Sequence, residues 1–282
     1  MEIKILVDTA ADLSDEEYQK YGFIKFNLPV LFNGEEIVDM TQDEFWKRLE
    51  EGQVPKTSQA SPEEFRKEFI KAQENNYALL CILISSNFSG TYSSAQRIKE
   101  EVGYEHIYLV DSLMASVAEK VLAFKALEYV KQGLDPNDIV TKLNEFRPYI
   151  RLYACIDTLK YLALGGRISS FLASFGNILR LRPIFTFTNE GTINILGKSI
   201  GLGFAFSKLI NHLKDEDIDY NYPIYPIYAD KSTNLVKFID KLSTEGYKIN
   251  KDNIMGIGST IGTHMGPGGF GLVYVLKTPK KE

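Results

Sequence analysis

Short apolar runs alternate with polar, helix-forming stretches along the whole chain. Runs rich in Ile, Val, Leu and aromatic residues, bounded by turn formers, are typical of buried strands. Such runs occupy residues 3–7, 24–30, 78–84, 107–110, 152–156, 184–188, 192–196, 224–228 and 272–276. The Asn-Glu-Gly sequence at 189–191 predicts a hairpin between two of these strands. The alternation of strands and helices predicts an α/β fold built largely on a parallel sheet.

Helix starts are marked by capping boxes, in which a Ser or Thr precedes a Glu by three positions. Three pairs fit this pattern: Ser14 with Glu17, Thr41 with Glu44, and Ser61 with Glu64. Pro62 occupies the favoured first helical position, and residues 113–132 carry apolar side chains at helical spacing. The composition shifts near Pro148, which predicts an N-terminal α/β domain at 1–148 and a C-terminal α/β domain at 149–282.

Composition excludes several classes of protein. The chain has 282 residues, of which 44% are hydrophobic and 24% charged, so wholesale disorder is excluded. A net charge of −5 gives no electrostatic reason to bind nucleic acid or an anionic membrane. The longest apolar run, residues 77–84, is far shorter than the roughly 20 residues of a transmembrane helix. No signal-peptide pattern is present, and Cys81 and Cys155 lie in apolar runs, so we expect a cytoplasmic protein with reduced thiols.

No motif predicts a metal or a nucleotide cofactor. The three histidines, His106, His212 and His264, lack metal-ligand spacing, and no Cys/His cluster occurs. A GxxxxGK[ST] phosphate loop is absent. The glycines at 256–262 do not form a dinucleotide fingerprint, because Pro267 prevents a long helix and few residues follow.

His264 lies in the segment 256–271, which holds seven glycines in sixteen residues. Glycine removes side chains and permits positive φ, which suits a close approach of the backbone to a ligand. The alternative is a glycine-rich turn between two strands.

Two hydroxyl clusters follow predicted strands or precede predicted helices. Thr57, Ser58 and Gln59 are not needed to start the next helix, because Ser61 already caps it. Residues 85–91, Ser-Ser-Asn-Phe-Ser-Gly-Thr, follow the strongest strand and open the next helix. In a parallel sheet this loop lies at the carboxyl edge, where helix N-termini bind anions. The alternative is an ordinary cap with a polar loop.

Charged residues next to other turns leave further alternatives open. Asp8 and Asp111 end apolar strands, and each is either catalytic or a local hydrogen-bonding residue. Arg167 follows Gly165 and Gly166, where a guanidinium beside flexible backbone could reach an anion. The two glycines could equally end a helix and leave Arg167 solvated.

Seven segments, taken in order, resemble the DegV family over nearly the whole chain. They are VDTAADL, PKTSQASPEEF, SSNFSGTYSSA, VDSLMAS, DTLKYLALGGRI, RPI and GTHMGPGGFGL. The departures are few: Ala60 stands where proline is usual, Arg182 replaces the commoner lysine, and residues 117–119 replace a stretch that tends to hold glycines.

The resemblance implies a two-domain fold, with a Rossmann-like parallel sheet that has helices on both faces in the N-terminal domain. The C-terminal α/β domain would contribute the GGRI and GTHMGPG motifs and part of an acyl pocket. A bacterial protein of this kind would bind one long-chain fatty acid, such as palmitate, stearate or oleate. It would present the carboxylate to a separate ATP-dependent fatty acid kinase subunit, and the acyl phosphate would pass through an acyltransferase to phospholipid synthesis. The family's carboxylate-binding positions correspond to Thr57, Ser58, Ser89, Gly90, Thr91, Arg167 and His264.

Elementary energetics agree with a fatty acid ligand. At about 0.8 kcal/mol per buried CH₂, a dozen methylenes contribute roughly 10 kcal/mol before the cost of association. Hydroxyls, a histidine and backbone amides could satisfy the carboxylate, and no cofactor is needed. One alternative is a Ser–His esterase or acyltransferase with Ser89 as nucleophile and His264 as base, although no GxSxG motif or third triad member is evident. A kinase active on its own is the other alternative, and the missing phosphate loop counts against it.

Overall fold

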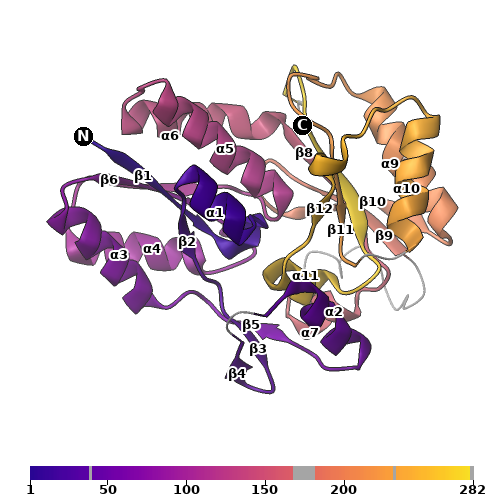
Figure 1. Ribbon diagram of the computed structural model, residues 1–282, viewed down its shortest axis with the longest axis horizontal. Coiled ribbons are helices and arrows are strands. Elements are labelled where there is room, and N and C mark those ends of the chain that lie inside the picture. The colour runs from indigo at the N-terminus through magenta and orange to yellow at the C-terminus, as the bar shows by residue number, and fades with distance from the viewer. Residues whose placement is uncertain (38–39, 168–181, 231–232, 280–282) are drawn as a thin grey trace. The chain divides into compact units, whose positions relative to one another are not determined.

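The computed structural model describes residues 1–37, 40–167, 182–230 and 233–279, and its contacts divide the chain into two compact units (Figure 1). Unit 1 comprises Met1–Pro29 and Ser58–Pro148. Unit 2 comprises Val30–Thr57 and Tyr149–Glu282. Each unit is described by itself below, with the labels of Figure 1.

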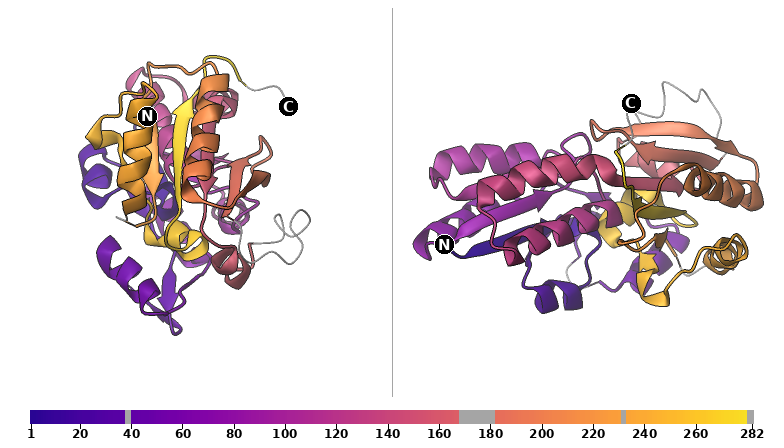
Figure 2. Two further views of the ribbon diagram at one scale, coloured as in Figure 1. Left: turned by 90° about the vertical axis from the view of Figure 1, so that its right-hand side faces the viewer. Right: turned by 90° about the horizontal axis from the view of Figure 1, so that it is seen from above.

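Unit 1 is a parallel sheet covered by helices, as expected. Its strand order is β2-β1-β6-β7, and all neighbours are parallel. The strands are β1 (Ile3–Asp8), β2 (Ile24–Phe26), β6 (Ala78–Leu83) and β7 (Ile107–Asp111). The helices are α1 (Asp15–Tyr21), α3 (Pro62–Glu74), α4 (Thr91–Val102), α5 (Val117–Lys131) and α6 (Pro136–Phe146). Helices α3 and α4 pack together on one face and α5 and α6 on the other, which leaves the central strand β6 wholly buried (Figures 1 and 2).

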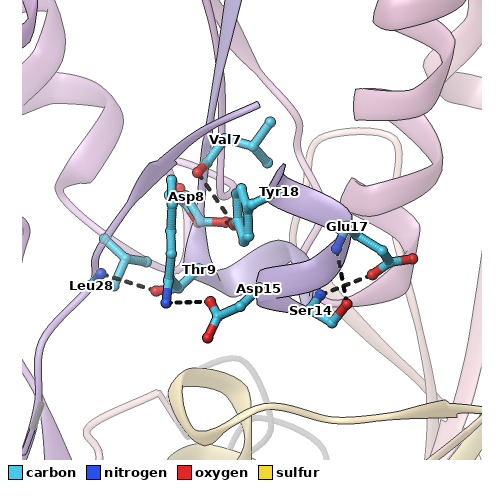
Figure 3. Close-up of polar contacts among 9 residues, drawn as sticks. Val7, Asp8, Thr9, Ser14, Asp15, Glu17, Tyr18 and Leu28 are labelled. Atoms are coloured by element: carbon cyan, nitrogen blue, oxygen red, sulfur yellow. Dashed lines mark hydrogen bonds and ion pairs between the residues drawn. The ribbon is translucent and has the colours of Figure 1, made fainter. Parts of the chain in front are cut away.

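Hydrogen bonds at the carboxyl end of β1 hold the first helix and the second strand of unit 1 (Figure 3). The Tyr18 hydroxyl donates to the carbonyl of Asp8 at 3.0 Å, and the Leu28 amide donates to Thr9 Oγ1 at 3.0 Å. The strand expected over 24–30 ends after Phe26, and Val30 begins β3 of unit 2. Pro29 lies in this break and has no N–H to continue a ladder.

The expected helix starts are confirmed with two differences. Ser14 with Glu17 and Thr41 with Glu44 form reciprocal capping boxes; Figure 3 shows the first. Ser61 caps α3 with Pro62 at its first position, but its hydroxyl accepts from the Glu63 amide, so the expected box with Glu64 is wrong. The helix expected from residue 113 begins at Val117, because Leu113 and Ser116 both have positive φ.

The main sheet of unit 2 is mostly antiparallel, so the expected parallel pattern holds for unit 1 alone. Its order is β10-β9-β8-β13-β11-β12, and only β11 and β12 pair in parallel. The strands are β8 (Ile150–Cys155), β9 (Arg182–Phe187), β10 (Ile193–Ser199), β11 (Tyr225–Tyr228), β12 (Met255–Gly256) and β13 (Phe270–Val275). The helices are α7 (Lys160–Leu164), α9 (Leu202–Asp215), α10 (Thr233–Thr244) and α11 (Ser259–Met265). The hairpin expected at 189–191 joins β9 to β10.

Residues 30–57 form an arm that belongs to unit 2. The arm holds the strands β3 (Val30–Phe32), β4 (Glu35–Glu36) and β5 (Lys56–Thr57) and the helix α2 (Gln42–Glu50). Helix α2 turns Phe45 and Trp46 against Gly262 of α11, and these aromatic side chains share a core cluster with Tyr161. The two units meet in the sequence at 148/149, and residues 30–57, which the sequence predicts to be part of the N-terminal domain, group with unit 2. An amphipathic helix needs an apolar partner, and α2 finds that partner in unit 2.

Candidate functional site

The expected residues of unit 2 meet at the C-terminal half of α11. Nε2 of His264 lies 2.8 Å from Oγ1 of Thr57, which ends β5 of the arm. The two residues are 207 positions apart in the sequence, and the arm brings them together because α2 packs directly on α11.

Backbone from the turn after α7 lies against the other side of the His264 ring. A Cβ placed on Gly165 would come within 2.2 Å of His264 Nδ1, so only glycine leaves room for the ring. Arg167 folds back over this turn, and its Nη1 donates to the carbonyl of Gly165 at 2.6 Å. Arg167 is thereby placed beside the histidine, as an anion site would require, and is not simply a solvated arginine.

The His264 imidazole is neutral at physiological pH. Burial lowers the pKa of His264 from 6.5 to about 4, and the positive charge of Arg167 lowers it further. The positive charge at this cluster is therefore that of the Arg167 guanidinium. A neutral ring offers one N–H donor and one acceptor, and Nε2 uses one of these on Thr57.

In unit 1 the second hydroxyl cluster forms the start of α4. Oγ of Ser89 lies 2.7 Å from Oγ1 of Thr91 and also accepts the Thr91 amide at 3.3 Å. Gly90 is the N-cap and gives the helix no side-chain hydrogen bond. Two hydroxyls and the positive end of a 12-residue helix therefore meet at one point, an arrangement that can bind an anion.

Three further polar residues lie near this helix start or in the segment before α3, and the sequence indicates Ser58 and Gln59 but not Ser94. The amide of Gln59 packs on Gly90, where a Cβ would lie 2.3 Å from its Nε2. Oγ of Ser94 is buried in the first turn of α4 without a hydrogen-bond partner. Ser58 is exposed, and its hydroxyl donates to the carbonyl of Gln59. Gln59 directly follows Thr57 and Ser58 in the polar run that the next helix does not need for its cap.

The structure thus brings together two groups of the expected residues, one in each unit. Thr57, Arg167 and His264 lie together in unit 2. Ser89, Gly90 and Thr91 lie together in unit 1, and Ser58 directly precedes Gln59, whose side chain packs on Gly90.

Both strand-ending aspartates are local hydrogen-bonding residues. Asp8 is fully buried and accepts from the amides of Ala10 at 2.9 Å and Ile84 at 2.8 Å, which ties β1 to the end of β6. Asp111 accepts from the amides of Ser86 and Leu113. Burial raises the pKa of Asp8 to about 7, and the two amides oppose that rise.

The glycine-rich segment contacts the protein's own side chains. Added Cβ atoms at Gly262, Gly266, Gly268 and Gly269 would meet aromatic, carboxylate or thioether groups within 2.7 Å. An added side chain at any of these positions would force its neighbour to move, which favours glycine for packing alone. The expected close approach of the backbone therefore occurs, but toward side chains of unit 2.

The described residues were also compared with the requirements of a metal site, a membrane span and a Ser–His hydrolase. Within them, no three His, Cys, Asp or Glu residues are grouped to hold a metal, and no helix is long and apolar enough to cross a bilayer. A Ser–His hydrolase would need a carboxylate on the second ring nitrogen of His264, whereas this Nδ1 is buried without a partner and faces Gly165. Cys81 and Cys155 are buried and free, as expected.

Comparisons with known proteins place the chain among fatty acid-binding relatives. Residues 2–277 match the model of the DegV family of uncharacterised proteins. A fatty acid-binding protein of Thermotoga maritima is 33% identical over 284 residues, covering 96% of this chain and 98% of that protein. The crystal structure of DegV, a fatty acid binding protein of Bacillus subtilis, is 28% identical with a TM-score of 0.83, covering 98% and 100% of the two chains. A stearic acid-binding protein of Eubacterium ventriosum is 27% identical with a TM-score of 0.82, covering 98% and 99%.

Proposed function

The chain belongs to the DegV family, and we propose that it binds one long-chain fatty acid, such as palmitate, stearate or oleate. The observation that carries the proposal is likeness over the whole chain to several fatty acid-binding proteins, with TM-scores of 0.8 or above. Burial of an acyl tail supplies roughly 0.8 kcal/mol per CH₂, which is ample for tight binding without any cofactor.

The proposal takes the carboxylate-binding residues from the resemblance to the DegV family. Arg167 supplies the charge, because the neutral His264 ring contributes only hydrogen bonds. Hydroxyl and amide donors come from Thr57, Ser58, Ser89, Gly90 and Thr91. A buried anion needs such donors, since an unpaired one is prohibitively costly.

The proposed role of the bound acid is presentation to a separate ATP-dependent fatty acid kinase subunit. The lack of a GxxxxGK[ST] phosphate loop fits a nucleotide that is bound by a separate subunit. Hydroxyl donors hold a carboxylate without covalent change, so an oxygen stays available to an incoming phosphoryl group. The acyl phosphate would then pass to an acyltransferase of phospholipid synthesis. An ATP-dependent partner and two free buried thiols fit a cytoplasmic, non-enzymatic lipid-binding subunit.

Two measurements test the proposal in turn. Denaturing mass spectrometry of protein purified from a bacterial host should return about one fatty acid per chain, and added oleate should raise the melting temperature of delipidated protein. Failure of both results would contradict fatty acid binding.

The kinase role is tested separately. With ATP and a catalytic kinase subunit, the oleate-loaded chain should yield acyl phosphate, whereas the chain alone should consume no ATP. Ester hydrolysis by the isolated chain that is lost in Ser89→Ala would favour the esterase instead.

A further inference from the structure

The loop that follows His264 is held in an unusual backbone conformation. Helix α11 ends at Met265, and both Gly266 and Gly268 then have positive φ, of 72° and 76°. Glycines lose much conformational freedom when they are fixed, and a seven-residue helix has little stability of its own. The end of α11 therefore depends on contacts from outside the helix.

Two carboxylates supply such contacts at the same glycine. Asp230, which follows β11, accepts the amide of Gly268 at 2.8 Å through Oδ2. On the same residue, a Cβ would come within 2.6 Å of Oδ2 of Asp157, so the Asp157 carboxylate packs directly on the loop. The neighbouring Ala229 amide donates to the carbonyl of Gly269 at 2.9 Å.

Arg182 balances the charge of this pair of carboxylates. Its Nη2 lies 3.2 Å from Oδ2 of Asp157. Burial raises the pKa of Asp157, the positive charge of Arg182 opposes that rise, and the negative charge of Asp230 adds to it. Without Arg182, two carboxylates would repel each other beside one backbone glycine.

We propose that Asp157, Arg182 and Asp230 form a clamp on the loop Gly266–Gly269 and thereby hold the His264 ring against Thr57. These three are positioning residues, because they act on His264 through the backbone. The clamp also occupies the amide of Gly268, so that amide is not offered to an anion. The consequence for ligand affinity rests on the proposed function, whereas the position of the ring does not.

The test uses the full chain with isotope-labelled histidine. The chain has three histidines, so three sets of ring signals are expected, and His106→Gln and His212→Gln assign them. The ring signals of His264 are then compared in the wild type, Asp157→Asn, Asp230→Ala, Arg182→Met and Arg182→Lys. Asp217→Asn serves as the matched control, because it removes the Asp of an exposed ion pair with Lys277 in unit 2. Oleate affinity and melting temperature are measured for each variant.

We expect Arg182→Met and Asp230→Ala to shift or broaden the His264 ring signals and to weaken oleate binding about tenfold. Asp157→Asn should act in the same direction. Arg182→Lys should keep both properties near wild type, because it retains the charge, and Asp217→Asn should change neither.

The clamp is overturned if the His264 signals stay unchanged in both Arg182→Met and Asp230→Ala. It is also overturned if Arg182→Lys is as damaging as Arg182→Met, or if Asp217→Asn shifts the signals as much. If a variant fails to fold, Asp157→Asn, which preserves side-chain shape, decides with the same readout. If the wild type does not bind oleate, the proposed function fails while the ring signals still decide the clamp.

Discussion

Gly165→Ala adds a single methyl group directly beside the His264 ring. The backbone of Gly165 has φ −81° and ψ −4°, a conformation that alanine adopts freely. The new Cβ would lie 2.2 Å from Nδ1 and 2.6 Å from Cε1 of His264, whereas ordinary contacts begin at 3.4 Å. The ring must therefore move by at least about an ångström or the turn must open.

Either response should break the bond to Thr57. The distance from His264 Nε2 to Thr57 Oγ1 is 2.8 Å, so a shift of that size either closes this distance to a steric clash or opens it beyond hydrogen-bond range. Loss of the bond costs about 1 kcal/mol and the added methyl strain about 1–3 kcal/mol. We expect the free energy of unfolding to fall by about 2–4 kcal/mol and oleate affinity to fall about tenfold.

Urea unfolding and calorimetric titration with oleate provide the measurements. The control is Gly203→Ala, a glycine of α9 with nothing within 4 Å of the added Cβ, which should be neutral or slightly stabilising. Gly165→Ala with unchanged stability and oleate affinity would refute the reasoning, because the ring would then not be confined by this turn.

Four further changes have defined outcomes. Ser89→Ala should weaken oleate binding by roughly 1–3 kcal/mol, since a donor to a buried anion is lost; an unchanged calorimetric dissociation constant would contradict this. Burial lowers the pKa of His264 from 6.5 to about 4, so the folded state binds fewer protons than the unfolded state in this window. Its contribution to stability should fall as the pH falls from 6.5 to 4, and His264→Gln should flatten that fall in urea titrations. The pH dependence due to Asp8 has the opposite sign, because folding raises the pKa of Asp8 from 3.8 to about 7. Its contribution to the free energy of unfolding should fall as the pH rises from 3.8 to about 7, and Asp8→Asn should remove that dependence in urea titrations. Gly262→Ala should push against Trp46, the only tryptophan of the chain, and change its fluorescence. An unaltered spectrum would contradict the close packing of Trp46 on Gly262.

Much of the fold follows from local sequence signals. The apolar run at 78–84 is the central strand β6, and the boxes at Ser14 and Thr41 start α1 and α2. These predictions succeed because burial on both faces and side-chain capping depend on residues close together in the chain.

The pairing of distant segments was not predictable in the same way. The three strands of the arm are two or three residues long, and their sequences do not indicate which unit the helix α2 packs against. The antiparallel pairing of β8 with β13 joins residues more than 100 positions apart, and an apolar strand reads alike in either direction. Candidate residues could be named from the resemblance, but the neutral state of His264 depends on burial that only the structure gives.

The glycines of the segment 256–271 have a packing role that the sequence did not indicate. Glycine was expected there so that a ligand could approach the backbone. In the structure, Gly262 admits Phe45 and Trp46 of the arm, and Gly266 admits the ring of Tyr161. Any larger residue at Gly262 would push α2 away from α11 and carry β5, with Thr57 at its end, away from His264. The glycines therefore act on the polar site indirectly, by letting two segments pack closely enough for a threonine and a histidine to share one hydrogen bond.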